Sequence, residues 1–216
     1  DYSTTYKLVK FIFKFITASS EMSVSFGRCM DLFGNDVDED GRSIGRDGKD
    51  VDIKKYFYSD GEIVMDRQRD AEYTKMMGEE IIKRYHQENI VFSSHLMAFA
   101  AFEIIQKRYR KLDIYGIMRL PEEEERISYQ EFVETIERLR KVLIEMRDKG
   151  KVKLHENIED TDIEKTIEIG LKNLGIYHSK RPLFHEKSSN EIGSADFSLL
   201  YYYHNRLDGY GLQKHI

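Results

Sequence analysis

Acidic residues at alternate positions form the first candidate site in this sequence. Asp36, Asp38 and Asp40 precede Gly41, which is how a calcium-binding loop begins, with carboxylate oxygens as the ligands. The twelfth position of such a loop is a bidentate glutamate, whereas this sequence has Asp47 there. This departure favours an acidic turn exposed to solvent over a calcium site.

The histidines and the single cysteine show no metal-binding pattern. Transition-metal sites draw several His, Cys or carboxylate ligands from short, regular spacings, and a single Cys29 cannot supply a thiolate site. His95 follows two serines, but neighbouring side chains on a helix do not face one another. We therefore predict no metal and no cofactor. The histidines considered are His86, His95, His155, His178, His185, His204 and His215.

His155 and Asp160 have the His-x4-Asp spacing of glycerolipid acyltransferases. In that family the histidine is the general base that deprotonates the acceptor hydroxyl, and the aspartate orients the imidazole. Here the pair lies in a polar turn, and the Gly-x-x-Phe-x-Arg and Pro-Glu-Gly segments that accompany the family motif do not occur. Because a motif outside its structural context is weak evidence, we predict a chance spacing and assign no catalytic residue.

The composition indicates a globular protein with no general affinity for polyanions. The chain has 216 residues, 40% of them hydrophobic, which is enough for one large or two small cores. Its net charge of −5 excludes attraction of the whole surface to nucleic acid. No apolar run approaches the roughly 20 residues of a spanning helix, so we expect a soluble chain.

The apolar spacing predicts an α+β fold dominated by helices. Residues 96–102 are apolar on almost every side and should form the centre of the core. Helices are expected at residues 6–18, 66–87, 96–109, 128–149 and 161–174, short strands at 22–26 and 152–154, and a loop at 34–61. Residues 198–203 fit a strand or a helix equally well.

Particular residues should begin, end or orient these helices. Ser93 and Ser94 are candidate N-caps, and Ser128 with Glu131 has a capping-box pattern. The helix at 66–87 should bury one apolar face, formed by Tyr73, Met76, Met77, Ile81, Ile82 and Tyr85. The first helix carries a lysine stripe that we expect in solvent in preference to a membrane surface, formed by Lys7, Lys10 and Lys14.

Several segments together resemble the C-terminal half of bacterial glycerol-3-phosphate acyltransferases of the Bacteroidetes type. They occur in the same order as in the family. Met22–Leu32 resembles a late strand of the acyltransferase domain, with Cys29 in place of the usual proline. The other segments are Ile90–Gly150, Asp162–Tyr177 and Tyr201–Leu207, the last with His204 where arginine is commoner.

The resemblance implies a reaction and a division of the chain. The parent would transfer an acyl group from acyl-CoA or acyl-carrier protein to glycerol 3-phosphate at the cytoplasmic face of the membrane, with its catalytic residues upstream of Asp1. Residues 1–33 would be the trailing helix and strand of the acyltransferase domain, 34–65 a surface loop and 66–216 a helical C-terminal domain. Asn205 and Arg206 would support either the acyltransferase core or their own terminal segment.

A second interpretation concerns the middle of the chain, which we predict to be winged-helix-like. Residues 94–154 read as two helices followed by a basic segment, the arrangement of a nucleic-acid-binding or protein-interaction module. The basic residues are Arg138, Arg140, Lys141, Arg147, Lys149, Lys151 and Lys153. Because Glu122–Glu125, Glu131, Glu134 and Glu137 oppose them and the net charge is negative, we predict no nucleic-acid binding.

Overall fold

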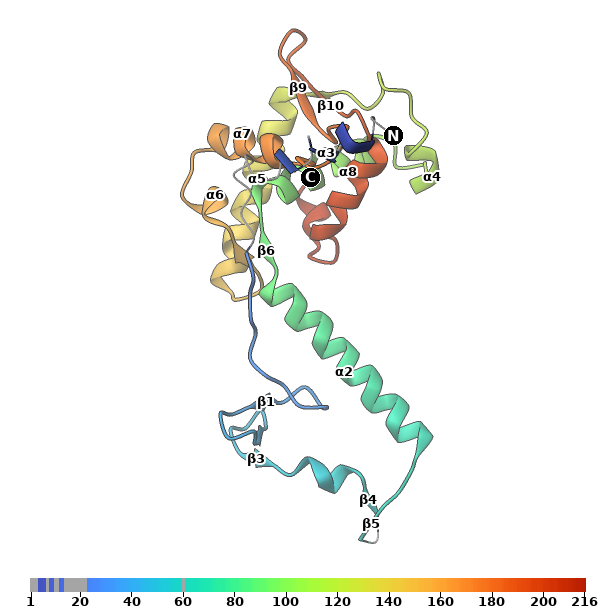
Figure 1. The fold of residues 1–216 in the computed structure, drawn as a ribbon, viewed down its shortest axis with the longest axis vertical. Helices are drawn as coiled ribbons and strands as arrows, with labels where there is room; N and C mark the ends of the chain where they lie inside the picture. The colour runs from blue at the N-terminus through green and yellow to red at the C-terminus, as the bar shows by residue number, and fades with distance from the viewer. Residues whose placement is uncertain (1–3, 7, 10–11, 14–22, 60) are drawn as a thin grey trace. The chain divides into compact units, whose positions relative to one another are not determined.

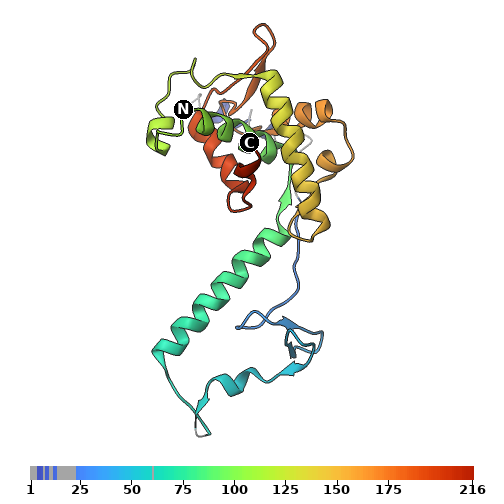
Figure 2. The same ribbon diagram turned by 180° about the vertical axis from the view of Figure 1, so that it is seen from behind.

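The computed structural model describes residues 4–6, 8–9, 12–13, 23–59 and 61–216. It confirms a helix-rich α+β chain with small sheets (Figures 1 and 2). Two compact units are present: one comprises Val24–Asn89, and the other contains Ile90–Ile216. The division at residues 33 and 65 refers to a longer parent protein and stays a prediction.

The unit Val24–Asn89 combines a small antiparallel sheet with one long helix. Phe33 packs its ring against those of Tyr56, Phe57 and Tyr73, and this aromatic cluster joins the loop region to the helix. The sheet order is β1-β2-β3, and β4 pairs with β5. The elements are β1 (Asp36–Val37), β2 (Ser43–Ile44), β3 (Asp50–Val51), η1 (Ile53–Tyr56), β4 (Tyr58–Ser59), β5 (Glu62–Ile63) and α2 (Arg67–Glu88).

The buried apolar face predicted for α2 is wrong. No residue of α2 is buried, and Met76, Ile82 and Tyr85 are 49%, 58% and 73% exposed. Polar contacts attach the helix to the sheet instead, because Arg84 donates hydrogen bonds to the Asp36 carboxylate and the Gly34 carbonyl. The apolar spacing predicted the helix itself correctly, but its unit supplies too few apolar residues to cover that face.

The strand predicted at residues 22–26 is also wrong over residues 23–26, the part of it that the structure describes. Residues 23–29 have no regular structure, and Phe26 is 88% exposed. They contact α2, since Ser25 donates a hydrogen bond to Glu88 and Arg84 donates one to the Arg28 carbonyl, and they contact β1, where Cys29 accepts the Val37 N–H. Alternating side chains alone do not make a strand without a partner strand. The helix predicted at 6–18, with Lys7, Lys10 and Lys14, lies largely outside the described residues.

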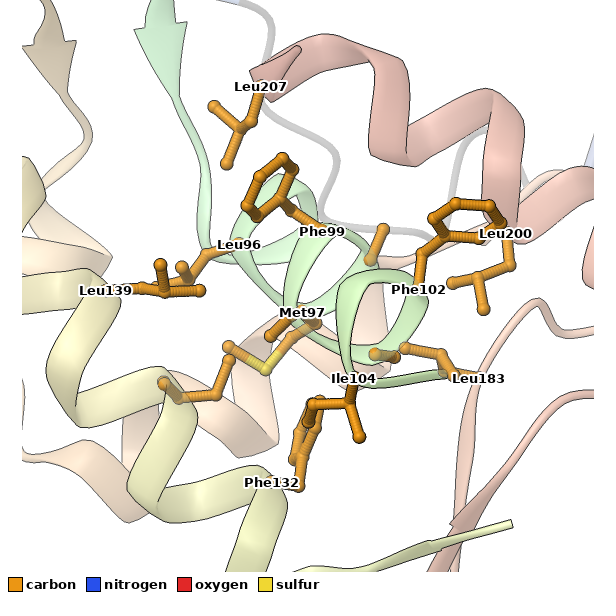
Figure 3. Close-up of a cluster of buried hydrophobic side chains, with 14 of the residues drawn as sticks. Leu96, Met97, Phe99, Phe102, Ile104, Phe132, Leu139, Leu183, Leu200 and Leu207 are labelled. Carbon is orange, nitrogen blue, oxygen red and sulfur yellow. The ribbon is translucent and has the colours of Figure 1, made fainter. Parts of the chain in front are cut away.

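The second unit is built around α3 (Ser93–Arg108). As predicted, Leu96–Phe102 forms the centre of the core, and each of its side chains is at most 1% exposed. Helices α5 (Tyr129–Asp148), α7 (Ile163–Asn173) and α8 (Phe197–His204) pack around it. Figure 3 shows side chains of α5 and α8, such as Phe132, Leu139 and Leu200, gathered around those of α3. Burial of each large apolar side chain contributes about 1.5–3 kcal/mol.

One glycine permits the close approach of α7 to α3. A Cβ atom at Gly170 would lie 2.5 Å from Cγ of Met97 and 3.0 Å from the Ser93 carbonyl oxygen. The helix ends at Asn173, and Gly175 just beyond it has the left-handed φ of 67° that L side chains avoid. The predicted end of this helix is thus confirmed.

Short strands connect these helices. β6 (Ile90–Val91) pairs in parallel with β8 (Lys153–Leu154), which confirms the strand predicted at 152–154. The second sheet is antiparallel, in the order β7-β10-β9. It consists of β7 (Ile127–Ser128), β9 (Phe184–Glu186) and β10 (Glu191–Gly193). The remaining short elements are α4 (Ile114–Ile117), α6 (Glu156–Glu159), η2 (Asn205–Leu207) and η3 (Leu212–His215).

Two predicted helix caps are absent. Ser93 is the first residue of α3, and the N-cap is Phe92, whose N–H bonds to Nδ1 of His95 at 3.3 Å. Ser128 precedes α5 but makes no capping hydrogen bond, because it belongs to β7 and pairs with Glu191. In both cases a strand runs directly into the helix, and the strand geometry fixes the first turn.

The segment left open at residues 198–203 is helical. Asp196 caps α8 by accepting the Leu199 N–H, and the helix packs along α3. Leu200 and Leu207 are buried, so the C-terminal segment is docked on the core. No helix in the described part of the chain combines the length and apolarity that crossing a membrane requires.

Candidate functional site

His155 acts as a helix cap in the structure. Its Nδ1 accepts the backbone N–H of Asn157 at 3.2 Å, and its ring stacks on Phe92 with centroids 4.7 Å apart. Asp160 is exposed and follows the last turn of the same short helix, α6. The imidazole is buried and its Nδ1 is already occupied, so the pair has the geometry of a capped turn.

The acidic turn of Asp36, Asp38 and Asp40 is neutralised by arginine. Asp38 accepts the backbone N–H groups of Asp40 and Arg42, and the Arg42 guanidinium pairs with the carboxylates of Asp38 and Asp40. Arg84 pairs with Asp36. Among the residues that the structure describes, no group of three or more His, Cys, Asp or Glu side chains is placed to hold a metal ion.

A histidine–carboxylate pair that no sequence motif predicts joins α8 to α3. His204 Nε2 is 2.8 Å from Glu103 Oε1, and the ring stacks on Phe99 with centroids 4.9 Å apart and planes 4° apart. The pair borders a hollow of about 620 Å³ that Gln106, Arg110 and other residues line. Since Nε2 faces Glu103 and Nδ1 faces the Asn205 amide oxygen, neither ring nitrogen is open to a substrate. Asn205 thus touches its own terminal segment.

Among the described residues, three groups have strongly displaced pKa values. Burial, followed by the charge of Arg206, lowers the pKa of His95 to about 4. Burial and then the neighbouring Glu122 raise the pKa of Glu125 to about 7. Burial and the Glu164 carboxylate, which accepts a hydrogen bond from the hydroxyl, raise the pKa of Tyr129 to about 12. These groups lie on different elements and do not form one catalytic cluster.

The second unit follows the winged-helix order, but with segments other than those predicted. Helix α3, strand β7, helices α5 and α7, and the hairpin β9–β10 follow in sequence, and the sheet order is first, third, second. The wing predicted at residues 148–154 is wrong, because β8 pairs with β6 outside this sheet.

Two of the basic residues of the predicted winged-helix module, both on α5, have internal roles. Arg140 donates hydrogen bonds to the carbonyls of Glu159 and Thr161, and Arg147 pairs with Glu159. These contacts attach the end of α5 to the turn around α6. They leave less positive charge available for a polyanion than the sequence indicates.

A groove separates α7 from the β9–β10 hairpin and is a second candidate binding surface. It encloses about 730 Å³, and Ile167, Leu171 and Leu183 are its apolar lining residues. Tyr129 borders one side, where its ring stacks on His185 with centroids 4.1 Å apart. The charged lining residues are Asp162, Glu164, Lys165, Glu168, Lys172, Arg181 and Lys187.

Comparisons with known proteins add no relative. No family, no curated protein and no solved structure matches the chain.

Proposed function

We propose that the chain is the C-terminal portion of a glycerol-3-phosphate 1-O-acyltransferase whose catalytic motifs lie upstream. The proposal depends on one observation, the collinear resemblance of four segments to that family. These segments are Met22–Leu32, Ile90–Gly150, Asp162–Tyr177 and Tyr201–Leu207.

The side-chain geometry agrees with catalysis by residues outside this chain. A general base must reach the substrate hydroxyl with a free nitrogen. His155 uses Nδ1 to cap α6, and His204 has both nitrogens against protein oxygens in an aromatic surround. Neither histidine is presented to a substrate as a base would be.

The proposed reaction assigns the chemistry to the upstream domain. The hydroxyl oxygen of glycerol 3-phosphate attacks the thioester carbonyl, the histidine base accepts the hydroxyl proton, and the thiol of coenzyme A or acyl-carrier protein leaves. This chain would stabilise that domain from its C-terminal side and act at the membrane surface only through the parent.

The decisive experiment uses the parent protein. We expect the preceding coding sequence to contain a His-x4-Asp motif directly after a strand. Replacement of that histidine by alanine should abolish acyl transfer from radiolabelled acyl-CoA or acyl-carrier protein, whereas His155→Ala should retain activity when the protein is folded. Absence of the upstream motif, or loss of activity in folded His155→Ala alone, would refute the proposal.

The winged-helix order of the second unit supports a second candidate, a protein-interaction module. Its helix α7 occupies the place of a recognition helix. That helix exposes Glu164 and Glu168 as well as Lys165 and Lys172, so it lacks the excess of positive charge that binding to a phosphate backbone requires, and protein is favoured over nucleic acid. A fluorescent DNA duplex should show no salt-dependent binding. Tight binding that weakens steeply with salt would favour nucleic acid.

A further inference from the structure

The outer strand of the second sheet has an open edge beside the groove. In the order β7-β10-β9, the described residues place no strand beyond β9. The groove lies between this strand and α7, since it is lined by Phe184 and His185 on one side and by Ile167 and Leu171 on the other. An open edge presents unpaired backbone groups that another extended segment can use.

The ladder shows which backbone groups face outward. Tyr129 donates its N–H to the Asn190 carbonyl at 3.0 Å, so by alternation Ile127 and Ile192 also form a bonded pair. Glu191 and Gly193, the two neighbours of Ile192 in β10, then direct their backbone N–H and C=O groups toward β9. The N–H and C=O of His185, opposite Ile192, therefore point away from the sheet.

Cations outnumber carboxylates in the lining of the groove by four to three. Glu168 pairs with Lys165, whereas Asp162 and Glu164 accept hydrogen bonds from neutral donors, a backbone N–H and the Tyr129 hydroxyl, and keep their negative charges. By contrast, no described residue forms an ion pair with the three exposed cations of the groove. These cations are Lys172, Arg181 and Lys187.

We infer that this groove binds an extended acidic polypeptide segment, which adds to β9 as a further strand. The outward N–H and C=O of His185 would supply backbone hydrogen bonds, and such pairing provides affinity in other strand-addition complexes. Lys172, Arg181 and Lys187 would select acidic side chains. Alternate apolar side chains of the segment would contact Leu171 and Leu183. The inference is independent of the acyltransferase proposal.

The test measures binding of a defined peptide to the whole chain. The probe is a fluorescein-labelled peptide of about seven residues in which glutamate alternates with valine, and the control probe has lysine in place of glutamate. Fluorescence anisotropy at low salt should show binding of the acidic probe at least about tenfold tighter than the basic one, and added salt should weaken it. Equal binding of the two probes, or no binding of the acidic one, would overturn the inference.

Substitutions at His185 separate the backbone contribution from that of the side chain. His185→Pro removes the outward N–H but no ladder bond to β10, and proline is tolerated at such edge positions. His185→Ala loses the same ring contacts and keeps the N–H. Peptide affinity should fall about tenfold more in His185→Pro than in His185→Ala, with circular dichroism showing both folded. Equal affinities would refute strand addition; if proline unfolds the chain, the His185 amide resonance of the unmodified protein must shift on peptide addition.

Charge reversals test the three cations against a matched set. Lys172→Glu, Arg181→Glu and Lys187→Glu together should reduce affinity at least about tenfold. Lys111→Glu, Lys141→Glu and Lys149→Glu change the net charge equally at exposed positions outside the groove and should reduce it far less. Equal losses in the two variants would overturn the inference, as would displacement of the peptide by duplex DNA. If the chain forms a dimer that His185→Pro dissociates, the edge of β9 binds a second copy of the chain instead.

Discussion

His204 and Glu103 connect α8 to α3 through a contact of 2.8 Å between the imidazole Nε2 and a carboxylate oxygen. Their side chains are only 7% and 13% exposed, and the rings of Phe99, Phe102 and Tyr201 surround the imidazole. A polar contact therefore crosses an otherwise apolar helix interface. In this setting, loss of one partner leaves the other buried without its hydrogen bond.

Glu103→Ala should lower the free energy of unfolding by about 1–3 kcal/mol, because it leaves His204 unsatisfied. Urea unfolding followed by circular dichroism measures the change. Glu145→Ala, at an exposed position of α5, should change it by less than about 0.5 kcal/mol. Joint replacement by Glu103→Leu and His204→Phe should recover much of the loss. If Glu103→Ala behaves like the control, the contact has no structural role.

Phe99→Ala should destabilise the second unit by about 3–5 kcal/mol, since it removes buried area and leaves a cavity in α3. The matched control is Phe26→Ala, because that ring is exposed. Urea denaturation of both variants compares them directly. A change within half a kcal/mol at Phe99 would contradict its position at the centre of the core.

Truncation after Asp196 should expose the face of α3 that α8 covers. Leu200 and Leu207 would be lost from that interface, so we expect a lower melting temperature and aggregation detected by light scattering. Truncation after Leu212 keeps both residues and should have a smaller effect. In the intact chain, amide exchange within Phe197–His204 should be slow. Fast exchange there would show that the segment is not docked.

The isolated chain should show no transfer of acyl groups to glycerol 3-phosphate above the blank rate, because the proposed base lies upstream. His155→Ala should leave this result unchanged. Turnover by the purified chain that His155→Ala abolishes would show that the helix-cap role is incomplete and that this histidine is catalytic.

Acidification should destabilise the second unit through His95. Its folded pKa of about 4 lies below the ordinary value of 6.5, so the unfolded chain binds the proton more readily between these values. The stabilising contribution is therefore present above about pH 6.5 and is lost as the pH falls toward 4. His95→Gln should show a shallower decline in unfolding free energy over this range, whereas exposed His178→Gln should follow the unmodified protein. Identical slopes for His95→Gln and the unmodified chain would contradict the shift.

The sequence predicted best what depends on neighbouring residues. The unbroken apolar stretch Leu96–Phe102 predicted burial, and these residues are buried. Gly150 and Gly175 correctly predicted where two helices end. Errors arose where an element that is distant in the sequence decides the local structure. The apolar residues of α2 have no core to cover them, and Ser128 occupies the N-cap position of α5 without a side-chain capping hydrogen bond, because it belongs to β7.

The candidate surfaces could not be predicted because they join distant residues. His204 and Glu103 are 101 positions apart. The open edge of β9 follows from the pairing of Ile192 with Ile127 on one side and His185 on the other. In both cases the sequence around one residue contains no motif that identifies its distant partner.

The position of α8 on α3 also affects how the chain is made. Residues 101 positions apart must meet, and at about 5–20 residues per second the ribosome needs roughly 5–20 s to synthesise the interval. During that time the Phe99 and Phe102 side of α3 has no covering helix and is available to chaperones that bind apolar segments. The yield of folded protein should therefore depend on translation speed and chaperone supply in addition to the stability of the finished fold.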